Sequence, residues 1–111
     1  MNTLEYMDAV KKRIGKDSDY AVAKALQMRA STIAGYRARG GQMDDEIAAK
    51  VAALLGIHPG LVMLDMHRAR ARTPEESNIW QEIYKGFLTL LPHAKFVGEE
   101  RRSLPRQVAT V

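Results

Sequence analysis

Apolar residues recur along most of this chain at intervals of three and four, which is the period of an α-helix. The first such stripe runs from Leu4 to Ile14, and Gly15 follows it as a stop signal. The longest stripe runs from Ile79 to Leu91. No segment shows the alternation of apolar and polar residues that is typical of a strand. The pattern predicts an all-α protein.

Cap and stop signals divide this pattern into six helices. The expected bounds are residues 3–14, 18–26, 30–39, 44–55, 58–72 and 73–91. Ser18, Asp44 and Thr73 are the expected capping residues, and Pro59 and Pro74 suit a first helical turn. We expect residues 1–72 to form one domain of five helices, residues 73–91 an additional C-terminal helix, and residues 92–111, which lack periodicity, a mobile tail.

Residues 18–39 are the most informative part of the chain for function. They predict two short helices joined by a tight turn, with Ala23 as the small residue where the helices cross. Met28 would fill the turn, and Ile33 and Tyr36 would hold the second helix to the core. The outer face of that second helix then carries small, polar and basic side chains. This layout is typical of a helix-turn-helix that inserts its second helix into the DNA major groove.

The chemistry of the second helix suggests a role for each outward residue. Arg29 can donate paired hydrogen bonds to a guanine, and Ser31 or Thr32 can contact a base edge or a thymine methyl group. Gly35 would allow a close approach of the DNA. Phosphate contacts position a protein on DNA without reading its sequence. The candidates for phosphate contacts are Ser18, Lys24, Arg37 and Arg39.

The charge distribution places positive charge on the same segment. Residues 1–42 hold eight basic and four acidic side chains, whereas residues 43–66 hold one basic and four acidic side chains. The formal net charge of the whole chain is +4. Basic charge on a predicted DNA reader favours double-stranded DNA as the partner, although an ordinary solvated surface would look the same on charge alone.

Residues 1–72 resemble the phage repressor and Cro-like helix-turn-helix family, also called the XRE family. Residues 18–26, 31–36 and 53–59 carry the resemblance. It implies a five-helix, lambda-repressor-like DNA-binding domain, dimers on palindromic operators and transcriptional repression. The segment 1–10 and the segment around Trp80 are also similar to small phage-related regulators, including those of filamentous phages.

The chain departs from the family pattern at the turn and at the start of the second helix. Gln27 stands where the family usually has glycine, so the turn is expected to be strained or to differ in geometry. Arg29 and Ala30 stand where the family favours a capping residue, which leaves Ser31 as an alternative cap. Relatives often carry glutamine or asparagine at the positions of Ala30 and Gly35. We therefore expect DNA shape to carry part of the specificity.

The C-terminal helix has too many large apolar residues for an exposed helix. It either folds back onto the core of its own domain or forms a homodimer interface, which would set two recognition helices about 34 Å apart. The interface candidates are Ile79, Trp80, Ile83, Tyr84, Phe87, Leu88 and Leu91. An alternative function is an antitoxin-like protein that binds a partner protein through this helix and autoregulates its operon.

Other classes of function have little support in the sequence. The chain has no cysteine, and His58, His67 and His93 lie far apart, so neither a metal site nor a cofactor is expected. No phosphate-binding glycine loop or nucleophile elbow is present, which argues against an enzyme. No apolar run approaches the ~20 residues that span a bilayer. Acidic Glu5 and Asp8 do not suit a signal peptide, so a cytoplasmic protein is expected.

Overall fold

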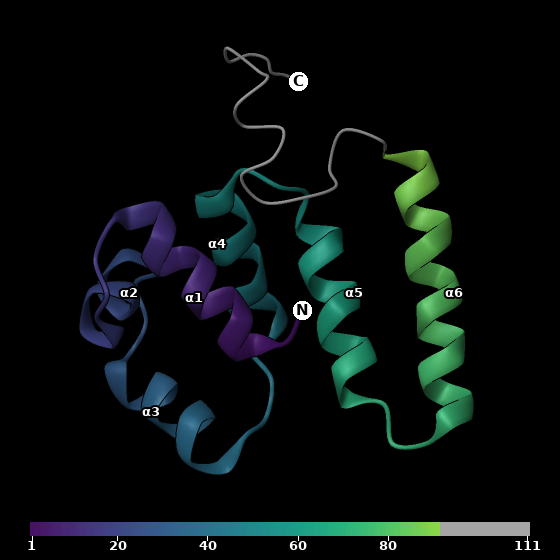
Figure 1. Cartoon of the computed structure of the whole chain (residues 1–111), viewed down its shortest axis with the longest axis horizontal. Helices are drawn as coiled ribbons and strands as arrows, with labels where there is room; N and C mark the ends of the chain where they lie inside the picture. Colours follow the sequence, from purple (N-terminus) through teal and green to yellow (C-terminus); the bar gives the residue numbers. More distant parts are fainter. Residues whose placement is uncertain (92–111) are drawn as a thin grey trace.

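The computed structural model describes residues 1–91, and this part of the chain contains six α-helices and no strand. The helices are α1 (Thr3–Ile14), α2 (Asp19–Ala25), α3 (Ala30–Arg39), α4 (Asp45–Leu55), α5 (Pro59–Arg70) and α6 (Pro74–Leu90), as Figure 1 shows. For residues 1–91, the prediction of an all-α protein is confirmed. The predicted tail, residues 92–111, lies outside the described residues.

The predicted capping residues begin their helices as expected. The Ser18, Asp44 and Thr73 side chains each accept a hydrogen bond from a backbone N–H of the following turn. The prediction that α5 continues to about Arg72 is wrong, because α5 ends at Arg70. The backbone N–H of Arg72 donates to the Glu76 carboxylate instead, at 3.2 Å. Arg72 therefore lies in the loop between α5 and α6 and is bonded to the first turn of α6.

The apolar core lies among the first five helices. α1, α2, α4 and α5 contribute most of it, and α3 adds Ile33. The loop before α4 adds Met43, whose side chain is fully buried although no periodic pattern predicted it. α6 has no buried residue and packs against α5 at one edge of the molecule, at the right of Figure 1. α3 lies at another edge, away from α6.

Thr3 fixes the start of α1 to the loop that follows α3. Its hydroxyl donates to the Gln42 side-chain oxygen at 2.7 Å and accepts from the Met43 backbone N–H at 3.1 Å. Thr3 is 1% exposed, so these bonds satisfy a hydroxyl that would otherwise be costly to bury. They also hold Met43 in the core.

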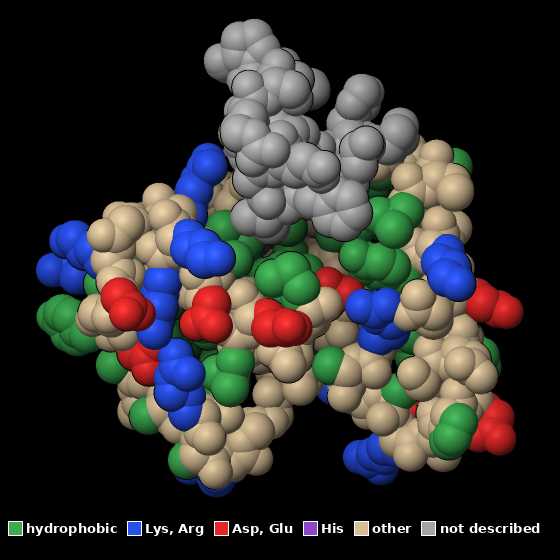
Figure 2. Space-filling view, viewed as in Figure 1, with side chains coloured by type: hydrophobic (Ala, Val, Ile, Leu, Met, Phe, Trp, Pro, Cys, Tyr) green, Lys and Arg blue, Asp and Glu red, His purple; other side chains and the backbone are tan. Residues whose placement is uncertain are grey.

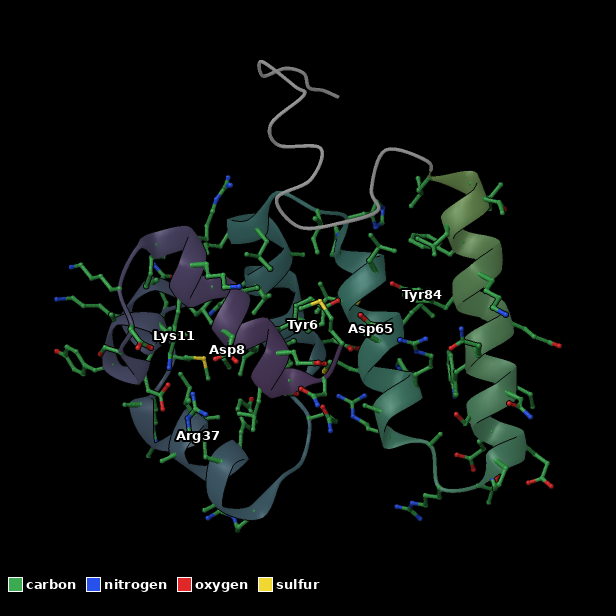
Figure 3. All side chains as sticks on the ribbon, in the orientation of Figure 1. Tyr6, Asp8, Lys11, Arg37, Asp65 and Tyr84 are labelled. Atoms are coloured by element: carbon green, nitrogen blue, oxygen red, sulfur yellow. The ribbon has the colours of Figure 1, made fainter. Side chains whose placement is uncertain are left out.

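Asp65 connects α1, α5 and α6 through a buried carboxylate. Its Oδ2 accepts from the Tyr6 hydroxyl at 2.5 Å and lies 3.3 Å from the amino group of Met1, and its Oδ1 accepts from Arg68 at 2.7 Å. Figure 3 shows Tyr6 and Asp65 facing each other between α1 and α5. Burial, together with the hydrogen bond to Asp65, raises the pKa of Tyr6 well above its usual value. Arg68 lies with its guanidinium carbon 4.5 Å from the ring centre of Tyr84 on α6.

Replacing Tyr6 by phenylalanine is expected to lower the free energy of unfolding by about 1.5–3 kcal/mol, because a buried charged acceptor loses one of its donors. Urea unfolding followed by circular dichroism measures this difference. The matched control is Tyr20→Phe, since Tyr20 is 69% exposed and its loss of a hydroxyl should leave stability unchanged. Equal stability of Tyr6→Phe and the unaltered protein would contradict a stabilising role for the Asp65 contact.

Candidate nucleic-acid interface

α2 and α3 are held together by a small set of buried apolar residues. The inward residues of α2 are Val22 and Ala23, followed by its C-cap residue Leu26. Ile33 of α3 is fully buried in the same core. Tyr36 is half-buried against the same core. The predicted inward residues of the two-helix unit are therefore confirmed. The exposed residues of α3 are Ala30, Ser31, Ala34, Arg37, Ala38 and Arg39.

One residue in the turn between α2 and α3 has a left-handed backbone conformation. Gln27 has a φ of 55°, and the Met28 backbone N–H donates to the Ala23 carbonyl at 2.9 Å. A residue with a side chain pays of the order of 1 kcal/mol for this backbone conformation, a cost that glycine would avoid. The Lys50 ammonium group on α4 donates to the Gln27 carbonyl at 3.3 Å. This contact ties the strained turn to the core helices.

α3 begins without a side-chain cap. Arg29 is the N-cap residue in an extended conformation, and its side chain makes no capping hydrogen bond. The alternative that Ser31 caps this helix is wrong, because Ser31 lies within the first turn. The Ser31 side chain is exposed and that of Thr32 is half-buried. Ser31 and Thr32 therefore lie in the first turn of α3, and the exposed Arg29 lies at its N-cap.

The outer side of α3 borders a shallow depression. The depression is lined by residues of α3 and of the loop that follows it, namely Ser31, Thr32, Gly35, Tyr36, Arg39, Gly40, Gly41 and Gln42. Three of the four predicted base-contacting residues, all but Arg29, therefore line one surface feature. Arg39, which was predicted to contact phosphate, lines the same depression.

Gly35 is buried, although the sequence suggested that DNA would approach its backbone. A Cβ atom built at Gly35 would lie 2.4 Å from Nη2 and 3.3 Å from Cζ of Arg39. The Arg39 side chain therefore folds back over Gly35 by one helical turn. A partner that reaches this point of α3 meets the guanidinium group of Arg39 before it meets the Gly35 backbone.

Arg37 forms a bidentate ion pair with Asp19 at the start of α2. The Arg37 Nε donates to Asp19 Oδ2 at 2.6 Å, and Nη2 donates to Oδ1 at 2.8 Å. Lys11 of α1 places its ammonium nitrogen 3.3 Å from the same carboxylate. The Arg37 bonds hold the pKa of Asp19 at about 2, below its usual value. Figure 3 shows Lys11 and Arg37 on the same side of the molecule. The phosphate contact predicted for Arg37 stays a prediction, and the structure gives this residue a role in joining α1, α2 and α3.

The phosphate candidates Ser18 and Lys24 and the base candidate Arg29 belong to the same two-helix unit. Lys24 and Arg29 are exposed, and no ion pair holds either of them among residues 1–91. The Ser18 oxygen accepts from the Ala21 N–H at 3.2 Å. Figure 2 shows basic side chains gathered over the end of the molecule that α1 and α2 form. The last turn of α1 contributes Lys11, Lys12 and Arg13 to the basic charge.

α6 uses only part of its apolar surface against α5. Trp80 stacks on His67 with ring centres 4.5 Å apart, Phe87 meets His58 edge-on at 5.2 Å, and Tyr84 covers Arg68. Ile79 and Ile83 remain 55% and 45% exposed. Of the predicted interface residues, Trp80, Tyr84 and Phe87 therefore pack within the chain, whereas Ile79 and Ile83 are left exposed. Leu90, which was not among the predicted interface residues, is 77% exposed.

The comparisons with known proteins give one distant relative. The chain is similar to the uncharacterized protein Gp-c of Pseudoalteromonas phage PM2, with 29% identity over 85 residues, covering 72% of this chain and 91% of that protein. No family model and no solved structure matches the chain.

Two further observations bear on other kinds of site. Among the described residues, no group of three or more histidine and acidic side chains is arranged to hold a metal ion. Within residues 1–91, every helix is too short or too polar to cross a membrane.

Replacing Asp19 by asparagine is expected to destabilise the protein by about 0.5–1 kcal/mol at pH 7, the range of a well-formed surface ion pair. The carboxylate is stabilising above its unfolded pKa of 3.8, and this stability is lost as the pH falls through its folded pKa of about 2. The difference between the two proteins should therefore shrink between these pH values. Urea unfolding at a series of pH values checks it.

The control for this experiment is Asp17→Asn. Asp17 is 94% exposed, and its one ion pair within residues 1–91 is with Lys11, so its loss should change stability by less than that of Asp19 at every pH. A difference between the Asp19 variant and the unaltered protein that is the same at pH 7 and pH 2 would count against the ion pair.

Proposed function

We propose that this chain is a sequence-specific DNA-binding regulator of transcription, of the phage repressor type, that binds a palindromic operator as a homodimer. In this proposal α1–α5 form a lambda-repressor-like domain and α3 is the recognition helix. The observation that carries it is the α2–turn–α3 unit. Ile33 fixes α3 to the core, while Arg29 and Ser31 stay exposed at its start.

The geometry of the unit supports insertion into a major groove. Short side chains such as Ser31, Ala34 and Ala38 are exposed along α3, so the helix is slim enough to approach base edges. Lys24 is exposed on α2, where the first helix of such a unit crosses the DNA backbone. The Asp19–Arg37 ion pair fixes α2 relative to α3. The similarity to a phage protein fits this assignment, although the function of that protein is itself not established.

The free face of α6 supports self-association. Ile79, Ile83, Gly86 and Leu90 follow one another at spacings of four, three and four, which is the repeat of a helix that packs along another helix. A Cβ atom built at Gly86 would meet nothing within 4 Å. A glycine inside a helix costs about 1 kcal/mol relative to alanine. Close approach of a second helix would account for that cost.

The same surface also fits the second candidate function. An antitoxin-like protein would use the exposed Ile79 and Ile83 to bind a different protein and would regulate its own operon through α3. The two candidates share the DNA-binding unit and differ in what covers α6.

DNA binding is tested by footprinting on the DNA that adjoins the gene. A protected palindrome is expected at physiological salt. If about six phosphates are contacted, the logarithm of the binding constant should fall with the logarithm of the salt concentration with a slope near −5. Arg29→Ala should relax the sequence preference by about 1–3 kcal/mol at one base pair.

The matched substitution is Lys24→Ala, which should weaken binding to all sequences alike and make the salt slope smaller by about 1. Absence of any protected site, together with equal affinity for unrelated DNA, would refute a sequence-specific regulator.

Self-association is tested by Ile83→Lys, which places a charge in the centre of the exposed stripe. Sedimentation equilibrium should show a dimer for the unaltered protein and a monomer for the variant, because burying an unpaired charge is costly. Asn78→Lys adds the same charge to the same helix outside the stripe and should leave the dimer intact. A monomeric unaltered protein would contradict the homodimer, and a stable complex with the product of a neighbouring gene would favour the antitoxin-like alternative.

A further inference from the structure

We propose that Arg39 reads a guanine in the major groove and that Gly35 is the residue that positions it for this contact. This inference rests on the proposed function and deepens it. It assigns one base contact, in addition to that of Arg29, to the arginine at the last position of α3, and it gives Gly35 a role other than close approach to DNA.

The path of the Arg39 side chain is the first observation. Arg39 is the last residue of α3, and side chains in a helix lean toward its N-terminus. The Arg39 guanidinium group accordingly lies over Gly35, one turn back. The group therefore lies along the middle of α3, in the depression that Ser31 and Thr32 also line.

The availability of the Arg39 donors is the second observation. Arg37 gives its guanidinium N–H groups to Asp19, whereas no ion pair or hydrogen bond from Arg39 occurs within the part of the chain that the structure describes. Its planar set of N–H donors matches the O6 and N7 acceptors of guanine. The two arginines near the end of α3 therefore differ in what they can do. Arg37 joins helices, and Arg39 can bind a base.

The choice of glycine at position 35 is the third observation. The residues with positive φ are Gln27, Gly15, Gly40, Gly41 and Gly56 among residues 1–91, so the backbone at Gly35 does not require glycine. A glycine within a helix lowers its stability relative to alanine. The atom that a Cβ would strike is Nη2 of Arg39, at 2.4 Å. With glycine at position 35, the Arg39 guanidinium group can lie over the helix at a place from which a Cβ atom would displace it.

The experiment is selection of binding sites from a random duplex library, followed by affinity measurements on the selected site and its single-base variants. The unaltered protein is expected to select a guanine at one position of each half-site. Arg39→Ala should reduce the preference for that guanine about tenfold to a hundredfold and leave the other positions unchanged. Gly35→Ala should reduce the same preference while the unfolding free energy stays equal or rises, because alanine is the better helix former.

Two further variants separate positioning from general effects. Gly35→Ala combined with Arg39→Ala should show no greater loss than Arg39→Ala alone, because the two residues act through one contact. Lys85→Ala removes one positive charge from α6 and should retain the full preference for the guanine.

Each result decides a different question. Equal weakening on every sequence in Arg39→Ala would show a phosphate contact and overturn the assigned base contact. Full retention of the guanine preference in Gly35→Ala would overturn the positioning role. Failure of the unaltered protein to enrich any sequence would instead refute the proposed function, and so the two failures are distinguishable.

Discussion

The attachment of α3 to the core through Ile33 is the constraint on which the candidate interface depends. Ile33 is the one large apolar side chain of α3 that is fully buried among the described residues, and Tyr36 adds a half-buried contact. A helix fixed along such a narrow line has most of its circumference free. The Asp19–Arg37 ion pair supplies the second fixed point, at the other end of the helix. Exposure and rigid orientation of α3 therefore come from the same few contacts.

α6 is positioned by a different kind of contact. Its inner side meets α5 through rings and a guanidinium group, and Arg68 is in turn held by the buried Asp65 carboxylate. Tyr6 on α1 contacts the same carboxylate, so the position of α6 is linked to the core by polar groups. Because the aromatic residues are used in this way, the aliphatic Ile79 and Ile83 are left at the surface. This division explains how α6 can pack within the chain and still present an apolar stripe.

The helices were predictable because each carries a local signal, namely an apolar stripe along one face, a side chain that caps its first turn, or a glycine that ends it. The burial of Thr3, Tyr6 and Asp65 was not predictable, because each depends on a partner at least 39 residues away in the chain. The sequence identified Ser31, Thr32 and Gly35 as neighbours on α3 but gave no sign that Arg39 folds over Gly35. The partner of Arg37 was likewise hidden, since no local pattern pairs it with Asp19, 18 residues earlier.

α3 and α6 have different main neighbours in the fold, since α3 packs on α1 and α2, and α6 packs on α5 (Figure 1). Inherited changes on the outer side of one helix therefore leave the supporting contacts of the other in place. Descendants of this chain can diverge at the surface of α6 while keeping the α2–turn–α3 unit, or diverge in α3 while keeping α6. The two surfaces are free to evolve at separate rates.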